Sequence, residues 1–577
     1  MKFEEMTKEQ LVEYIKNLNE EQNGKYGLVW DKEKEPERIV EECDKYIPIL
    51  EEQKSKNINN SGENHILIEG DNFHALTVLN YTHKESIDII YIDPPYNTGN
   101  KDFVYNDRFV DLEDGYRHSK WLNFMKKRVQ LSRDLLTDDG VIFISIDDNE
   151  QAQLKMLCDE IFGEINYVGC LPRITKKSGK QHSGDISKNH DYVLVYCKNK
   201  MDTAFRGIEG EASGFDFEDE YVETRGKYKL NQTLDYNSLW YNPTMDFPIE
   251  VDDKTYYAGG SKELHDDRHN GIHNPKDWVW RWSQAKFDFG LKNGFVVIKE
   301  GKDRPRIYTK TYLNATIDKK GDVYSIKYIS RENNLSSIAL TENEYSNDNA
   351  KKELDGILKE STFDFPKPTS LIKALCNIVD KKDYTILDFF AGSGTTGHAI
   401  LSMNKADGGH RKFILCTNNE NNICENVTYK RIQNVINGYG KVEATGGNLK
   451  YFKTEFVDNT NNRDQLYYDL TEKCIPMLSM KENCYNEVKG NSEYKIFKND
   501  DGTKTTAVYF DLFGNKEQEF IDELKNIEGN KIIYKFSLSD YVDESIFKDV
   551  KDYKIEAIPY KIVEVYRRLV KISKGDI

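Results

Sequence analysis

Short apolar runs alternate with longer amphipathic stretches in the first half of the chain. Between the runs, residues 115–136 and 149–163 have the apolar spacing of helices. The runs themselves are β-branched or aromatic and lack polar alternation; they are "IDIIYID" (87–93), "GVIFISID" (140–147) and "YVLVYCK" (192–198). Strands of this kind are typical of a largely parallel sheet that helices cover on both faces.

The same alternation returns near residue 370. Helical patterns at 368–379 and 394–404 flank the apolar run "TILDFF" (385–390), and "KFILCT" (412–417) follows. Together the two blocks predict an α/β fold with a mostly parallel sheet. Between them the sequence is rich in Tyr, Trp, Asn and Gly and has few long helical patterns. That change indicates a mixed α/β domain inserted into the sheet unit.

The patterns divide the chain into five expected parts. They are an N-terminal helical segment (1–60), the first half of the α/β domain (61–204), the inserted domain (205–360), the second half of the α/β domain (361–455) and a C-terminal α+β domain (456–577).

Composition favours a soluble, cytoplasmic protein. Charged residues make up 31% of the chain, no apolar run approaches membrane-spanning length, and the N-terminus has no apolar segment of signal-peptide type. The net charge of −17 taken alone argues against a nucleic-acid partner. The stretch 171–190 is locally basic, however, with five Lys or Arg against one Asp. In isolation such a run is as well explained by a solvated face as by phosphate contact.

The sequence "LDFFAGSGTTGHA" (387–399) reads as a strand, a Gly-rich turn and a helix. Glycines let the backbone approach a ligand closely, and the helix N-terminus offers unpaired N–H groups. The spacing matches neither a dinucleotide fingerprint nor a phosphate loop. By itself the motif favours a nucleotide-like ligand over a merely structural turn.

A second motif, "DPPY" (93–96), ends the run that begins at Ile87. The two prolines restrict the backbone and remove two N–H groups, so that Asp93 and the Pro94 carbonyl can both act as fixed acceptors. Two acceptors suit one NH₂ group, and Tyr96 offers a flat face for stacking on a base. Ligands of open α/β sheets bind beyond the carboxyl ends of strands. If the strand ending at Phe390 neighbours the strand ending at Asp93, both motifs face one crevice.

Three histidines of "HDDRHNGIH", His265, His269 and His273, are spaced four apart, which on a helix would make a metal-binding face. Gly271 and the Asp and Asn content instead favour a loop. The sequence therefore predicts no metal.

"DPPYNTG" and "FAGSGTT" resemble the catalytic and cofactor motifs of S-adenosylmethionine-dependent DNA amino-methyltransferases. The order, with the catalytic motif first, resembles the β-class N6-adenine enzymes, which include the modification subunits of type III restriction systems. Further matches are "YGLVWDKEKEPE" (26–37), "ILIEGDNFHAL" (66–76), "ISIDDNEQAQLKMLCDEIFGE" (144–164), "KNHDYVLVYCKN" (188–199) and "FDFPKPTSLIKAL" (363–375). The resemblance implies a Rossmann-like methyltransferase fold with circularly permuted motifs and an inserted target recognition domain.

The resemblance also implies roles for individual residues. Asp93, Pro94, Pro95 and Tyr96 would form the catalytic motif, in which Asp93 and Pro94 hold the target amino group and Tyr96 stacks on an adenine flipped out of duplex DNA. The cofactor S-adenosylmethionine would bind at Asp71, Lys367, Asp388, Phe390, Gly392, Gly394, Thr395, Thr396 and Glu420. With this fold in view, phosphate contact becomes the favoured reading of the basic stretch, through Arg173, Lys176, Lys177, Lys180 and Lys188.

Other functions stay open at this point. The same motifs would serve an N4-cytosine enzyme, although Asp93 stands where that group more often has serine. RNA or protein amides are alternative substrates, and a non-catalytic DNA-binding specificity subunit would retain the fold. The oligomeric state and a separately encoded restriction subunit are likewise open.

Overall fold

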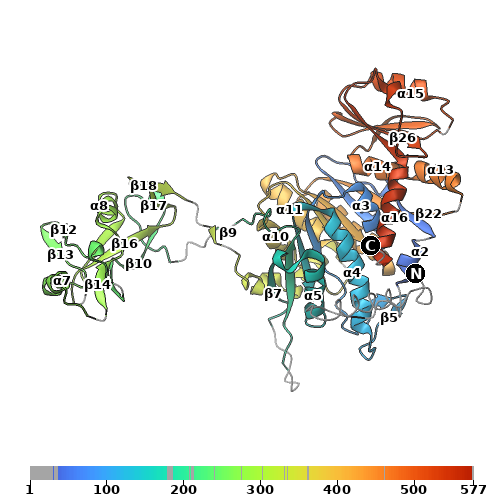
Figure 1. Ribbon diagram of the computed structural model, residues 1–577. Coiled ribbons are helices and arrows are strands. Elements are labelled where there is room, and N and C mark those ends of the chain that lie inside the picture. Colours follow the sequence, from blue (N-terminus) through green and yellow to red (C-terminus); the bar gives the residue numbers. More distant parts are fainter. Residues whose placement is uncertain are drawn as a thin grey trace, which may run out of the picture. The chain divides into compact units, whose positions relative to one another are not determined.

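The computed structural model of the protein (Figure 1) describes residues 30, 37–43, 45–177, 186–206, 208–209, 214–239, 241–274, 276–301, 303–321, 323–329, 332–333, 335–359, 363–460, 462–511 and 513–574. It divides into two compact units, Met1–Phe205 with Ser336–Ile577, and Arg206–Leu335. None of the described helices combines the length and the hydropathy that crossing a bilayer requires.

A nine-stranded sheet forms the centre of the larger unit. Its spatial order is β1 (Tyr46–Glu52), β22 (Asn448–Asp458), β2 (Asn64–Glu69), β21 (Lys412–Thr417), β20 (Thr385–Asp388), β3 (Ile87–Ile92), β6 (Leu136–Ile146), β8 (His190–Cys197) and β7 (Tyr167–Ile174). All neighbouring pairs from β22 to β6 are parallel, whereas β1 and β8 run antiparallel to their neighbours. The predicted α/β fold with a mostly parallel sheet is confirmed.

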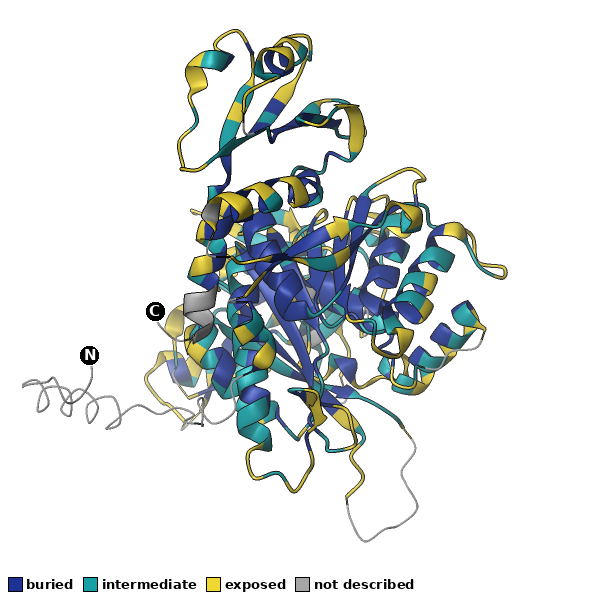
Figure 2. Ribbon diagram, turned by 90° about the vertical axis from the view of Figure 1, so that its right-hand side faces the viewer, coloured by how far each residue is buried: buried dark blue, intermediate teal, exposed yellow. Residues whose placement is uncertain are grey.

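Helices cover this sheet in two series. Helices α3 (Asn72–Thr82), α4 (Arg117–Leu135) and α5 (Gln151–Phe162) pack one against the next. Helices α10 (Thr369–Asn377), α11 (Thr395–Asp407), α12 (Lys430–Asn437) and α9 (Asn347–Leu358) form the other series. Successive residues of β3, from Ile89 to Ile92, are all buried, so both faces of the sheet are covered (Figure 2).

Strand β20 pairs with β3 in parallel, with Leu387 opposite Ile90. This pairing confirms that the strands preceding the two motifs are neighbours, although almost three hundred residues separate them in the chain. Parallel neighbours end at the same edge of a sheet, so the segments that follow β3 and β20 emerge together.

The C-terminal part adds a second sheet to the larger unit. Its order is β23 (Asn486–Gly490), β24 (Tyr494–Lys498), β25 (Lys504–Tyr509), β26 (Asn530–Ser537) and β27 (Tyr553–Pro559), with helix α15 (Glu517–Lys525). Helices α13 (Arg463–Lys473), α14 (Ile475–Glu482) and α16 (Tyr560–Lys574) bring apolar side chains of this part, such as Leu470 and Ile562, into the large core. The expected domain 456–577 is therefore continuous with the core of the α/β unit.

The smaller unit is built from short antiparallel pieces. Its main sheets are β10 (Tyr228–Thr233) with β16 (Arg306–Tyr312) and β15 (Val296–Lys299), β11 (Asp235–Ser238) with β14 (Asp277–Trp280), β12 (Ile249–Val251) with β13 (Lys254–Tyr256), and β17 (Ala315–Lys320) with β18 (Val323–Tyr328). Short strands β9 (Ile208–Glu209) and β19 (Glu332–Asn333) pair with each other, and helices α6 (Val222–Arg225), α7 (Lys262–His269) and α8 (Gln284–Lys292) complete the unit.

The structure corrects three details of the sequence interpretation. The smaller unit ends at Leu335, and residues 336–359, expected in the insertion, belong to the larger unit. The segment expected as N-terminal and helical contributes strand β1 to the main sheet, after the short helix α2 (Arg38–Glu42). Residues 265–273 were expected as a loop, but 265–269 belong to helix α7 (Lys262–His269), whose first turn Ser261 caps by accepting from the Leu264 N–H at 3.2 Å.

Candidate functional site

A cavity of about 400 Å³ lies at the sheet edge where β3 and β20 end. Asp93 and Pro95 line it from the segment after β3, and Phe390 and Gly392 line it from the turn after β20. The segments after β2 and β21 complete the wall with Asp71, Asn72, Thr417, Asn418 and Glu420. The cavity therefore combines both motifs of the sequence in one place.

The Gly-rich turn owes its shape to two glycines in the left-handed region. Gly392 has a φ of +49° and Gly394 a φ of +75°. A Cβ atom added to Gly394 would lie 3.1 Å from a methyl carbon of Thr428. Side chains other than hydrogen are thus disfavoured by conformation at both positions and by space at Gly394, and helix α11 starts at the next residue.

Three of the expected cofactor residues support this turn from beneath. Thr396 donates its hydroxyl to Asp388 Oδ2 at 2.6 Å, and the Phe390 N–H donates to Asp388 Oδ1 at 3.0 Å. Thr395 donates its hydroxyl to the Lys367 carbonyl at 2.9 Å. Asp388, Thr395 and Thr396 are buried and do not line the cavity. Their bonds hold the turn in position.

Burial sets the protonation of Asp388. The side chain is 3% exposed, and desolvation raises the pKa of its carboxyl to about 7, against the lowering effect of the Thr396 and Phe390 hydrogen bonds. An unfolded aspartate has a pKa of about 3.9. Between about pH 4 and pH 7 the Asp388 carboxyl is protonated in the folded chain and ionised in the unfolded chain. The contribution of this group to the free energy of unfolding is therefore complete below about pH 4 and is lost as the pH rises through about 7.

Asp388→Asn should remove this pH dependence, because the amide stays neutral. In urea unfolding at pH 5 and pH 8, we expect the wild type to lose stability relative to the variant on going to pH 8, by on the order of a few kcal/mol. Asp138→Asn, at an exposed carboxylate, is the control. An unchanged difference between wild type and Asp388→Asn at the two pH values would contradict the assignment.

Asp93 lies at the centre of a small polar cluster. Tyr96 donates its hydroxyl to Asp93 Oδ1 at 2.8 Å, and Lys367 donates from Nζ to Asp93 Oδ2 at 2.5 Å. The Lys367 ammonium also lies 5.0 Å from the centre of the Tyr96 ring. Burial, then the charges of Asp93 and Asp191, raise the pKa of Tyr96 well above its usual value, so that its hydroxyl remains a donor.

The two proline carbonyls differ in their partners. Trp121 donates its indole N–H to the Pro95 carbonyl at 2.7 Å, which fixes the segment against helix α4. No donor to the Pro94 carbonyl occurs among the described residues. Pro94 itself is buried and does not line the cavity.

Arg128, which the motifs did not single out, ties the walls of the cavity together. Its side chain is completely buried and donates from Nε to Asn72 Oδ1 at 2.5 Å. The guanidinium also forms ion pairs with the carboxylates of Glu37, at 2.8 Å, and Asp71, at 3.5 Å. Asn72 in turn donates to the Phe389 carbonyl at 3.1 Å. Glu37 and Asn72 lie in the stretches 26–37 and 66–76, whose resemblance to the family could have marked them as functional residues. Arg128 lies outside the stretches quoted for the resemblance.

Arg173 is not available to phosphate, contrary to the sequence interpretation. Its guanidinium is completely buried and donates to both carboxylate oxygens of Asp191 and to the Tyr345 carbonyl. The Tyr96 hydroxyl lies 3.4 Å from Asp191 Oδ2, so this ion pair contacts the Asp-Pro-Pro-Tyr segment from behind. Of the expected lysines, Lys177 and Lys188 are exposed, Lys176 is half-buried and Lys180 lies outside the described residues.

The family model N6_N4_Mtase, described as DNA methylase, matches residues 87–429. The Mod subunit of the type III restriction-modification enzyme EcoPI of Escherichia phage P1 is 35% identical over 410 residues, 64% of this chain and 60% of that protein. The type II methyltransferase M.KpnI of Klebsiella pneumoniae is 32% identical over 397 residues, 67% of this chain and 88% of that protein.

The chain thus spans less than two thirds of the length of the EcoPI Mod subunit. Among solved structures, the M1.HpyAVI-SAM complex matches with a TM-score of 0.29 and 11% identity, over 64% of this chain and 98% of that chain. The fold assignment rests on the strand order described above.

Proposed function

Because this chain belongs to the DNA methylase family, we propose that it transfers the methyl group of S-adenosylmethionine to N6 of an adenine in double-stranded DNA. The pairing of β20 with β3 carries the proposal, since it brings Asp93 and the Gly-rich turn to the wall of one cavity. The proposal includes a cytoplasmic location, where the protein would meet its DNA substrate.

The residues of the cavity suit S-adenosylmethionine. Gly392 permits close approach of a ligand to the backbone, and Phe390 offers an aromatic surface. Asp71 and Glu420 supply carboxylate oxygens for ligand hydroxyl or amino groups, and they suit a cationic sulfonium better than an anion. Lys367 would bind the cofactor's carboxylate. When bound, the cofactor supplies an electrophilic methyl group.

Asp93 and the Pro94 carbonyl would accept the two N–H groups of the adenine amine. Its lone pair is conjugated with the ring, and two accepted hydrogen bonds favour the pyramidal geometry in which that pair can attack. As the bond from N6 to the methyl carbon forms, the bond from that carbon to sulfur would break, and Asp93 would stabilise the positive charge that develops on N6. One of the two N6 protons would then be lost to solvent, which leaves a neutral methylamino group. No metal or nucleophilic side chain enters this step.

The adenine must leave the duplex to reach Asp93, which costs a few kcal/mol of stacking and pairing. Tyr96 would recover part of this by stacking. Lys367 now lies over the Tyr96 ring and holds Asp93. Its transfer to the cofactor's carboxylate would free both the ring face and one Asp93 oxygen for the base.

The test is transfer of label from methyl-labelled S-adenosylmethionine to a panel of duplex DNAs, followed by identification of the modified base. We expect N6-methyladenine at one sequence context. Label on cytosine N4 would show that the target base is cytosine and not adenine. Label on RNA or protein, with none on DNA, would overturn the proposal. Asp93 supports adenine, because the N4-cytosine enzymes that the motif resembles more often have serine there.

Lysines of the basic stretch are proposed to contact DNA phosphates. A Lys176→Gln, Lys177→Gln, Lys188→Gln variant should bind all duplexes more weakly. The slope of log K against log salt should fall by up to about 0.9 for each phosphate that the variant no longer neutralises. Salt titrations of binding measure this, with the exposed Lys548→Gln as control. An unchanged slope would remove these lysines from the interface.

A further inference from the structure

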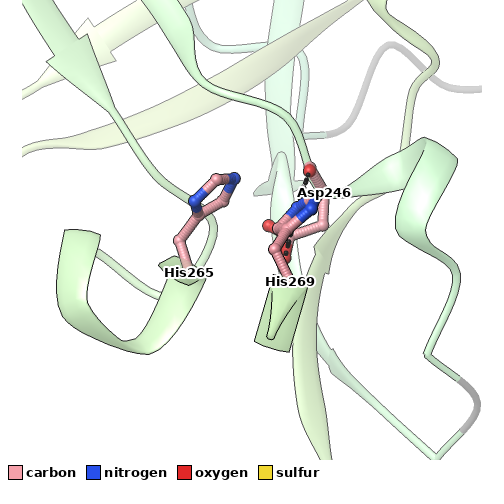
Figure 3. Close-up of side chains that lie close together, drawn as sticks. All are labelled: Asp246, His265 and His269. Atoms are coloured by element: carbon pink, nitrogen blue, oxygen red, sulfur yellow. Dashed lines mark hydrogen bonds and ion pairs between the residues drawn. The ribbon is translucent and has the colours of Figure 1, made fainter. Parts of the chain in front are cut away.

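Helix α7 presents two histidines side by side in the smaller unit. His265 and His269 are one helical turn apart, and their ring centres are 4.3 Å from each other. Asp246, which follows the short helix η4 (Pro243–Met245), lies against His269, with His269 Nε2 2.9 Å from the Asp246 carbonyl and 3.7 Å from Asp246 Oδ2 (Figure 3). One ligand atom from each residue lies within 4.8 Å of the others.

We propose that Asp246, His265 and His269 bind a divalent transition-metal ion of the zinc type. Two imidazoles and a carboxylate are a common zinc ligand set, and a water molecule would fill the fourth position. The premise for expecting no metal, a loop at this position, is wrong, because residues 262–269 are helical and Gly271 comes only after the helix ends.

The surroundings of His265 support this assignment independently of the spacing. Its Nε2 atom is buried and has no hydrogen-bond partner among the described residues. Its other ring nitrogen, Nδ1, lies 3.3 Å from an oxygen of Asp266. A carboxylate on the second nitrogen is the usual partner of a metal-bound histidine and directs the free nitrogen to the metal.

Asp246 keeps capacity for a metal although it is already paired. Its buried carboxylate accepts two hydrogen bonds from Arg268, at 2.8 and 2.9 Å, and one from the Tyr241 hydroxyl at 3.1 Å. A carboxylate offers about four lone-pair sites, so one remains. Arg268 holds the group in position and offsets part of its charge.

A metal here would join helix α7 to the segment after η4. The core nearby is small, with seven buried apolar side chains in the cluster around Trp280. An ion that links these two elements would add its binding free energy to the stability of the folded unit. The inference concerns the smaller unit alone and does not depend on methyl transfer.

The experiment measures Zn²⁺ bound by the full chain in equilibrium dialysis. The chain also has nine cysteines, eight of them buried, which could bind Zn²⁺ themselves. The site is therefore identified from the difference in bound Zn²⁺ between wild type and variants. His265→Ala/His269→Ala should bind one equivalent less than wild type. His273→Ala, whose ring instead pairs with Asp277 at 2.8 Å, should bind as wild type does. Asp266→Ala should weaken the site by about tenfold or more.

Co²⁺ absorption gives a second measurement on the unmodified chain. We expect the visible bands of a nitrogen and oxygen site without a thiolate charge-transfer band, and removal of these bands by added Zn²⁺. Equal stoichiometry in wild type and the double variant, loss of the ion in His273→Ala, or a thiolate spectrum would each overturn the proposal.

Discussion

Asp93→Ala is expected to lower the rate constant of methyl transfer by at least about 100-fold, the usual effect of removing a preorganised electrostatic group. The loss should appear in kcat, because the acceptor acts most strongly on the charge that develops on N6. Affinity for S-adenosylmethionine should stay nearly unchanged, since Asp71, Phe390 and Gly392 still line the cavity and Lys367 becomes free for the cofactor's carboxylate. Single-turnover assays and cofactor titrations measure the two effects separately.

Asp93→Asn refines this experiment. The amide keeps one acceptor but presents an NH₂ group to the adenine amine, so it should be nearly as inactive as alanine. Asp138→Asn, 81% exposed, is the matched control and should retain full activity. Near wild-type transfer by Asp93→Ala would remove Asp93 from the mechanism, whereas loss of cofactor binding would make it part of the cofactor site.

Arg173→Ala is expected to destabilise the protein by about 3–5 kcal/mol, because it leaves the buried Asp191 carboxylate without its partner. Asp191 is 2% exposed and the guanidinium is completely buried, so water cannot replace the missing bonds. Burial lowers the pKa of Arg173, but the charge and hydrogen bonds of Asp191 outweigh this effect and hold the pKa above its ordinary value, so the charge persists at any working pH. Urea unfolding measures the decrease in stability.

The same variant separates a structural role from phosphate contact. Under conditions where Arg173→Ala remains folded, the salt dependence of its DNA binding should match that of wild type. Arg173→Met/Asp191→Leu should recover part of the stability, since removing both charges leaves neither unpaired. A stable Arg173→Ala protein with a reduced salt slope would restore the sequence interpretation.

Regular elements followed from local patterns. The predicted helix over 115–136 is α4, Arg117–Leu135, and the run from Ile87 is β3, because strands buried on both faces require continuous apolar residues and helices require a 3.6-residue period. The motif 265–273 was predicted as a loop, although 265–269 are helical, because the Ser261 side chain that caps the helix lies outside the motif. Local composition there favoured a loop.

Residue roles depended on burial, which charge alone does not reveal. Arg173 sits in a basic stretch with Lys176 and Lys177, yet β7 turns it inward onto Asp191 while Lys177 is exposed. Strand β7 ends at Ile174, so Lys176 and Lys177 lie in the segment beyond it and meet a different environment from Arg173. Asp388 likewise belongs to the Gly-rich motif but lies beneath the turn, where its two carboxylate oxygens accept hydrogen bonds from the Thr396 hydroxyl and the Phe390 N–H.

The sequence by itself predicted the main strands and helices of the α/β unit and singled out candidate residues for amino-group chemistry, because periodicity and motif chemistry are local properties. Only the tertiary structure decided that β20 lies beside β3, that Lys367 holds Asp93, and that Arg173 is enclosed. These are contacts between residues 18 to almost 300 positions apart. They arise when the sheet assembles and apolar strands exclude water, and no local pattern encodes which strand becomes the neighbour of another.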